Sequence, residues 1–127
     1  MQTLSFDPVL GHITTFGGHP VSCAAGHAAL NILVSSGVID TVKEKESLFR
    51  ELLVSPKIKA FHSAGLLAAL ELESFAEVQR VIHHCIENGV ITDWFLFNDK
   101  CLRIAPPLVI SNEEILFACN VIMNAIR

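Results

Sequence analysis

The sequence has little positive charge, and its few basic residues form no stripe. Its 127 residues include 9 Lys and Arg against 13 Asp and Glu, a formal net charge of −4. Proteins that bind nucleic acid cluster Lys and Arg on one face, so we expect no nucleic-acid partner. The cysteines include no Cys-x-x-Cys pair, which argues against a zinc site or a disulfide framework. As in cytoplasmic proteins, reduced and buried thiols are expected at all four positions, Cys23, Cys85, Cys101 and Cys119.

Charge is also missing from one long stretch. No Asp, Glu, Lys or Arg lies between Asp7 and Asp40. Polar residues, glycines and Pro20 interrupt the stretch, so it does not predict a membrane span. No basic region follows Met1, as it would in a secretory signal peptide. Because a large exposed apolar surface normally marks an interaction site, we expect residues 8–39 to be covered by a partner that this chain does not contain.

The hydrophobic periodicity predicts an α+β fold. Apolar residues recur at helical spacing in four segments, which are 20–35, 39–53, 75–88 and a last helix opened by the capping box Ser111–Glu114. Four apolar segments predict strands, and these are 58–63, 66–72, 90–97 and 101–105, the last two joined by a turn at Asn98 and Asp99. Residues 1–19 show no period and predict an extended arm. We therefore expect a small, mostly antiparallel sheet of about four strands covered by helices, preceded by the arm and a linking helix.

The segment Gly11–Pro20, GHITTFGGHP, contains the clearest candidate for a binding site. Two hydroxyls, Thr14 and Thr15, precede a Gly17-Gly18 turn, and Pro20 then starts a helix, where its missing N–H is harmless. The N-terminus of a helix carries unpaired N–H groups and a partial positive charge, so it favours a phosphate. A plain turn that caps the helix explains the same residues, and spacing alone leaves both interpretations open.

Two other groups of residues have simpler explanations. His19, Cys23 and His27 recur every four residues, a spacing that suits metal ligands. Pro20 places His19 at the helix cap and no fourth ligand is indicated, so buried or capping roles are favoured and no metal is expected. The aromatic residues of the third predicted strand, Trp94, Phe95 and Phe97, are expected to fill the core rather than to stack on nucleobases.

Four short segments of the sequence resemble motifs of a known family. They are GHITTFGGHPVSCAA at 11–25, SAGLLAALEL at 63–72, ENGVIT at 87–92 and LRIAPPLVIS at 102–111, followed by EEI at 113–115. In this order they resemble the C-terminal part of the class-III pyridoxal-phosphate (PLP) aminotransferases, the group of ornithine, acetylornithine, lysine and 4-aminobutyrate aminotransferases. The resemblance implies a fragment of a fold-type I PLP enzyme. Residues 1–19 would belong to the interface with the large domain and the dimer partner, and residues 20–127 would form the small domain.

The same resemblance implies roles for three residues. Thr15 would contact the phosphate of the PLP bound by the neighbouring subunit of a homodimer, and Thr14 would lie beside cofactor and substrate. Arg103 would bind a substrate carboxylate or pair with an acidic side chain of the large domain, since a guanidinium grips a carboxylate at two points. Simpler roles remain open. Thr15 could serve the turn alone, and Arg103 could pair with Glu71 or Glu73.

The departures from the family are equally informative. The Schiff-base lysine of the family lies upstream of the TFGGHP word, in the large domain. The lysines present match no family motif and lie in contexts expected to be exposed: Lys43, Lys45, Lys57, Lys59 and Lys100. The aspartate that protonates the pyridine nitrogen and the glycine-serine phosphate cup are missing too, and a family arginine is replaced by His62 or Ser63. No catalytic residue is therefore assigned to this chain.

These observations lead to two functional hypotheses. The first is the C-terminal part of an aminotransferase that moves an amino group from an amino acid or ω-amine to a 2-oxo acid, inactive without its large domain. The second is a free-standing, non-catalytic α+β module that binds a small anionic ligand or a partner protein.

Overall fold

The computed structural model describes residue 7 and residues 14–127. The described residues divide into two compact units, a first that ends at Ser36 and a second that spans Gly37–Arg127. The predicted extended arm lies largely outside the described residues, and residues 15–18 form a turn. The predicted boundary between residues 19 and 20 concerns the domains of a longer enzyme and stays a prediction.

The first unit contains the predicted linking helix, α2 (Pro20–Ser35), with Pro20 in its first turn. None of the residues of α2 is buried, although the helix is rich in apolar side chains. Val21 and Val34 are 71% and 76% exposed. Cys23 is exposed as well, so the expectation that all four cysteines are buried was wrong for this one. The reason is that the described residues of its own unit offer α2 no core to pack against.

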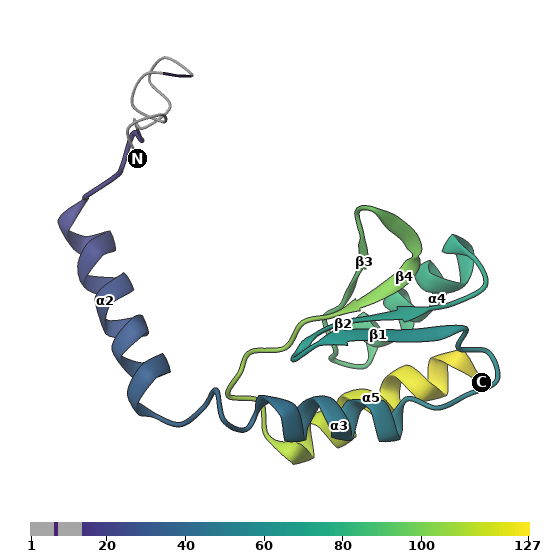
Figure 1. The fold of residues 1–127 in the computed structure, drawn as a ribbon. Coiled ribbons are helices and arrows are strands. Elements are labelled where there is room, and N and C mark those ends of the chain that lie inside the picture. Colours follow the sequence, from purple (N-terminus) through teal and green to yellow (C-terminus); the bar gives the residue numbers. More distant parts are fainter. Residues whose placement is uncertain (1–6, 8–13) are drawn as a thin grey trace. The chain divides into compact units, whose positions relative to one another are not determined.

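The second unit combines helices with one sheet, as Figure 1 shows. Its elements in chain order are α3 (Val42–Leu52), β1 (Ala60–Ala64), β2 (Leu67–Glu71), α4 (Phe75–Glu87), β3 (Asp93–Phe95), β4 (Asn98–Ile104) and α5 (Asn112–Ile126). The strands lie in the order β1-β2-β4-β3, and every neighbouring pair is antiparallel. The predicted α+β fold with a small antiparallel sheet is confirmed.

The core lies between one face of the sheet and the helices. Leu70 of β2 pairs with Leu102 of β4, and neither side chain is exposed to solvent. The helices contribute Val78 and Val81 of α4 and Ile122 of α5 to the same cluster. Because side chains alternate along a strand, the neighbouring pair in the sheet, Ala69 and Arg103, lies on the opposite face.

The remaining thiols belong to this core. Cys85, Cys101 and Cys119 are buried, as expected. Burial raises the pKa of the Cys85 thiol to about 11 and that of the Cys119 thiol to about 12. Since the thiolate is the reactive form, these two side chains act as small apolar core residues.

Polar caps fix where two of the helices begin. The Ser74 side chain accepts the Glu77 N–H at the start of α4. At the start of α5, Ser111 accepts the Glu114 N–H while the Glu114 carboxylate accepts the Ser111 N–H. The capping box predicted at Ser111–Glu114 is therefore confirmed.

The hairpin between β3 and β4 differs from the prediction. The turn consists of Leu96 and Phe97, whereas Asn98 is already paired with Phe95 in the sheet. An irregularity between Trp94 and Phe95 shifts the register, as a β-bulge does by adding a residue to one strand. Phe97 is consequently 98% exposed, so its predicted place in the core was wrong.

Trp94 also differs from the expectation, because it lies at the edge of the core. Its side chain is 37% exposed and packs edge-to-face on Phe75 at a centroid distance of 5.9 Å.

The length and composition of the helices decide whether any of them can span a membrane. Within the described part of the chain, no helix combines the length and the apolar character that crossing a membrane requires.

Candidate functional site

The two threonines of the first unit lie at a tight turn that leads into α2. Thr14 and Thr15 are exposed. A Cβ on Gly17 would lie 1.8 Å from the Thr14 Oγ1, so a larger residue there would require the Thr14 side chain to move. Gly18 has a φ of 79°, a left-handed conformation that also favours glycine. The two glycines therefore serve the turn, and the turn presents both hydroxyls to solvent ahead of a helix N-terminus.

The N-terminus of α2 is not closed by a side chain. His19, the N-cap residue, makes no side-chain capping hydrogen bond, and no acidic residue lies in the first turn. Such a terminus retains the partial positive charge of its N–H groups. The donors available here, two hydroxyls and a helix N-terminus, are those that suit a phosphate.

Arg103 lies on the open face of the sheet in the second unit. It lies in a cross-strand row that runs from His62 through Ala69 and Arg103 to Asp93. The Arg103 Nη2 is 3.4 Å from the Asp93 Oδ2, and the two side chains are 44% and 46% exposed. The simpler alternative for Arg103, a pair with Glu71 or Glu73, is not what the structure contains. Glu71 lies 3.6 Å from the His62 Nε2, and Glu73 pairs with Lys59.

A small hollow surrounds this ion pair. It has a volume of about 290 Å³ and is lined by Ile91, Thr92, Asp93, Arg103 and Ala105. The Thr92 hydroxyl donates to the Arg103 carbonyl at 2.5 Å, which fixes the backbone that carries the guanidinium. The hollow therefore has both the Arg103 guanidinium and the Asp93 carboxylate in its lining. Sequence reasoning identified Arg103 but missed Asp93, because only the β3–β4 register brings the two together.

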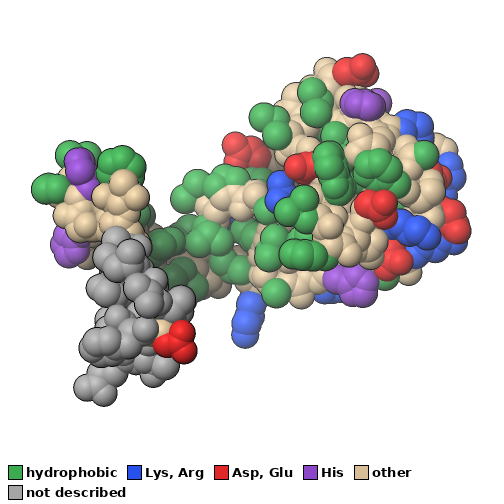
Figure 2. All heavy atoms as spheres, turned by 90° about the horizontal axis from the view of Figure 1, so that it is seen from above, with side chains coloured by type: hydrophobic (Ala, Val, Ile, Leu, Met, Phe, Trp, Pro, Cys, Tyr) green, Lys and Arg blue, Asp and Glu red, His purple; other side chains and the backbone are tan. Residues whose placement is uncertain are grey.

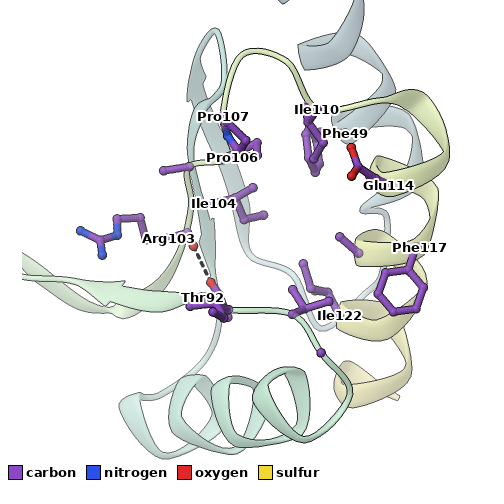
Figure 3. A pocket seen from close by; sticks show the side chains of 15 residues that line it. Phe49, Thr92, Arg103, Ile104, Pro106, Pro107, Ile110, Glu114, Phe117 and Ile122 are labelled. Atoms are coloured by element: carbon purple, nitrogen blue, oxygen red, sulfur yellow. Dashed lines mark hydrogen bonds between the residues drawn. The ribbon is translucent and has the colours of Figure 1, made fainter. Parts of the chain in front are cut away.

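A larger cleft lies beside the hollow and has a different character. Its volume is about 450 Å³, and its lining is mostly apolar, with Phe49, Ile104, Ile110, Phe117 and Ile122 among the residues. Figure 3 shows that the Arg103 side chain points away from this cleft, while the Thr92 hydroxyl is bonded to the Arg103 carbonyl at its edge. Arg103 is one of the residues that line this cleft, but its guanidinium points away from the cleft interior.

Lys45 and Lys59 make contacts away from these cavities. Lys45 is half-buried, contrary to the expectation that every lysine is exposed, because its Nζ donates to the Leu108 carbonyl at 2.7 Å. Lys59 lies 2.5 Å from Glu73, and this hydrogen bond raises the pKa of Lys59. A lysine that attacks a carbonyl needs a lowered pKa, so Lys59 is shifted in the wrong direction.

The described residues contain no arrangement for a metal ion, and the predicted binding residues belong to different units. Among the described residues, no group of three or more His, Cys, Asp or Glu side chains is arranged to hold a metal ion. The candidate binding residues are divided between the units. Thr14 and Thr15 belong to the first unit, and Arg103 belongs to the second.

Comparisons with known proteins define the class. The model of the family Aminotransferase class-III matches residues 2–126. The chain therefore belongs to the class-III aminotransferase family, whose members are PLP enzymes. It is 35% identical to the ornithine aminotransferase of Bordetella pertussis over 91% of this chain and 30% of that protein. It is 33% identical to the acetylornithine aminotransferase of Haemophilus ducreyi over 82% of this chain and 26% of that protein.

Solved structures of aminotransferases resemble this chain in fold as well. An ornithine aminotransferase from Toxoplasma gondii superposes with a TM-score of 0.79 at 32% identity, over 91% of this chain and 29% of that one. A second structure of this enzyme, at 30% identity and a TM-score of 0.79, has PLP at partial occupancy in its active site. The chain spans about 30% of the length of the relatives that it matches.

Proposed function

We propose that this chain supplies the C-terminal part of a PLP-dependent aminotransferase, in which Arg103 binds the carboxylate of an amino-acid or 2-oxo-acid substrate. The observation that carries the proposal is the position of Arg103 on the open face of the sheet, half-exposed at the edge of a 290 Å³ hollow. A guanidinium offers two parallel N–H donors to a carboxylate. Arg103 thus orients the substrate, and 2-oxoglutarate is the acceptor that we propose.

We propose that the turn before α2 binds the phosphate of PLP. The Thr15 hydroxyl, with Thr14 beside it, would contact the phosphate of PLP, and the open N-terminus of α2 would add its partial positive charge. When bound, PLP supplies the electron-withdrawing ring on which amino-group transfer depends. The residues of this chain bind and orient, and the lysine that forms the Schiff base would belong to the large domain.

The proposed partners follow from what the chain leaves uncovered. A large domain and a second subunit of a homodimer would cover α2, none of whose residues is buried. The coverage of about 30% of each relative supports a missing large domain. We place the assembled enzyme in the cytoplasm, in agreement with the free thiols of the described chain.

The 127-residue chain by itself is expected to self-associate. Hydrophobic side chains reach the surface in Figure 2, and α2 contributes Leu30, Ile32 and Val34, which are 57%, 60% and 76% exposed. Replacing Ile32 with lysine should weaken association by about tenfold or more, since burying one such side chain stabilises by about 1.5–3 kcal/mol. Light scattering over a concentration series measures this.

The matched control for Ile32→Lys is Val109→Lys, an equally drastic change at a side chain that is 73% exposed in the second unit. It should leave association almost unchanged. A parent chain that stays monomeric at high concentration, with no bound detergent or partner, would contradict the expectation.

The proposed function is tested by labelling. The purified chain is incubated with PLP, reduced with borohydride and mapped by mass spectrometry. We expect scattered, substoichiometric labelling of exposed lysines and no turnover, because the proposal places the Schiff-base lysine in another domain. The assembled enzyme, either one longer chain or this chain combined with its large domain, should then transaminate. One stoichiometrically labelled lysine in the isolated chain, with an absorbance band that an amino donor bleaches, would overturn the proposal that this part is inactive alone.

A further inference from the structure

The carboxylate that faces Arg103 is itself held in place. Asp93 lies directly opposite Arg103 in the antiparallel β3–β4 pair. One carboxylate oxygen of Asp93, Oδ1, accepts the Trp94 N–H at 2.8 Å. The other oxygen, Oδ2, accepts from the Arg103 Nη2 at 3.4 Å. The Asp93 side chain is short and bonded at both oxygens, so it forms a fixed point for the longer and more flexible arginine.

The contact with Asp93 occupies only part of the hydrogen-bonding capacity of the Arg103 guanidinium. Arginine has five N–H donors, and Asp93 receives one contact, from Nη2. On the other side of Arg103 in the sheet lies Ala69, whose methyl group offers no hydrogen-bond acceptor. Arg103 therefore keeps donors for a second carboxylate that enters the hollow. With Asp93 on one side and the Thr92 hydroxyl on its carbonyl, Arg103 is restrained at both ends of the residue.

We propose that Asp93 is a positioning residue for Arg103, and this inference rests on the proposed role of Arg103 in binding a substrate carboxylate. A free arginine side chain loses rotamer freedom when it binds. The Asp93 contact removes part of that freedom beforehand, so the carboxylate of the substrate meets a guanidinium that already lies in the hollow. Because both side chains are about half exposed, the contribution is that of a partly screened ion pair.

The first test uses the 127-residue chain and needs no ligand. Nitrogen NMR of the Arg103 side chain measures the rotation of the guanidinium about its Nε–Cζ bond. Asp93→Asn keeps an oxygen for the Trp94 N–H but removes the charge, and it should speed this rotation by about two- to fivefold. The matched control is Glu71→Gln, since Glu71 contacts His62 and not Arg103, and it should leave the rate unchanged. An unchanged rate in Asp93→Asn would overturn the inference.

The second test uses the assembled enzyme and steady-state kinetics. Asp93→Asn should raise the KM for 2-oxoglutarate by about two- to fivefold, with kcat nearly unchanged, and Asp93→Glu should restore part of the loss. A KM that falls would mean that Asp93 competes with the substrate for Arg103, and the inference would be wrong.

Arg103→Ala distinguishes a failure of the proposed function of Arg103 from a failure of the positioning role of Asp93. If it leaves the KM for 2-oxoglutarate unchanged, the proposed function of Arg103 fails. If Arg103→Ala raises the KM but Asp93→Asn does not, the proposed function stands and only the positioning role of Asp93 is lost.

Discussion

Replacing Arg103 with alanine in the assembled enzyme is expected to lower kcat/KM for 2-oxoglutarate by about 10- to 150-fold. The physical reason is the loss of charge-assisted hydrogen bonds, each worth about 1.5–3 kcal/mol, from the one guanidinium in the 290 Å³ hollow. Steady-state kinetics with the acceptor varied measures the effect. An ω-amine donor that carries no carboxylate should react with nearly its parental kcat/KM, because it has no group for Arg103 to bind.

The control for this prediction is Arg103→Lys, which keeps the charge but not the planar fork of donors. Its kcat/KM should fall between the values for the parent and for Arg103→Ala. Equal activity of parent and Arg103→Ala would show that the carboxylate is bound by another residue. Asp93 would then be an ordinary structural partner of Arg103 across the strands.

Leu70→Ala is expected to have the largest effect on stability. Leu70 lies in β2, an interior strand, and its side chain is not exposed to solvent. Removing a fully buried leucine side chain costs about 2–5 kcal/mol, from lost burial and from the cavity that remains. Native domains are stable by only about 5–15 kcal/mol, so this is a large fraction. Urea unfolding followed by the fluorescence of Trp94, the single tryptophan, measures the change.

Leu67→Ala provides the matched control, because it makes the same change in the same strand at a side chain that is 53% exposed. It should cost about 1 kcal/mol or less. Both variants are best made in the Ile32→Lys background, so that association does not distort the unfolding curves. Equal losses in the two variants would mean that Leu70 does not belong to a well-packed core.

Local signals were enough to predict most of the elements from the sequence. Pro20 at a helix start and the Ser111–Glu114 capping box act within one helical turn, and both predictions hold. The β3–β4 turn was misplaced because Asn and Asp favour turns by their local chemistry. Here the register of the sheet keeps Asn98 in β4 and places Leu96 and Phe97 in the turn. Tertiary pairing therefore overrode the local preference.

The candidate site was predictable only in part. Thr14, Thr15 and Arg103 were identified because their sequence words resemble the family, and their roles remain proposals. Asp93 lies outside the motifs that resemble the family. Its importance depends on the pairing of β3 with β4, which places it opposite Arg103. Cys23 was expected to be buried because none of the cysteines forms a Cys-x-x-Cys pair, which favours reduced, buried thiols. Its helix, α2, has no buried residue, a fact that depends on which partners are present and not on local pattern.

The strand order β1-β2-β4-β3 also has a consequence for how the second unit folds. The β1–β2 hairpin joins residues that are close in sequence, but β2 pairs on its other side with β4, across the whole of α4 and β3. Contacts between distant residues form more slowly than local ones. During synthesis Leu70 therefore remains unpaired until Leu102 has left the ribosome. Until then the new hairpin exposes an unpaired strand edge and an apolar face, which a chaperone can recognise.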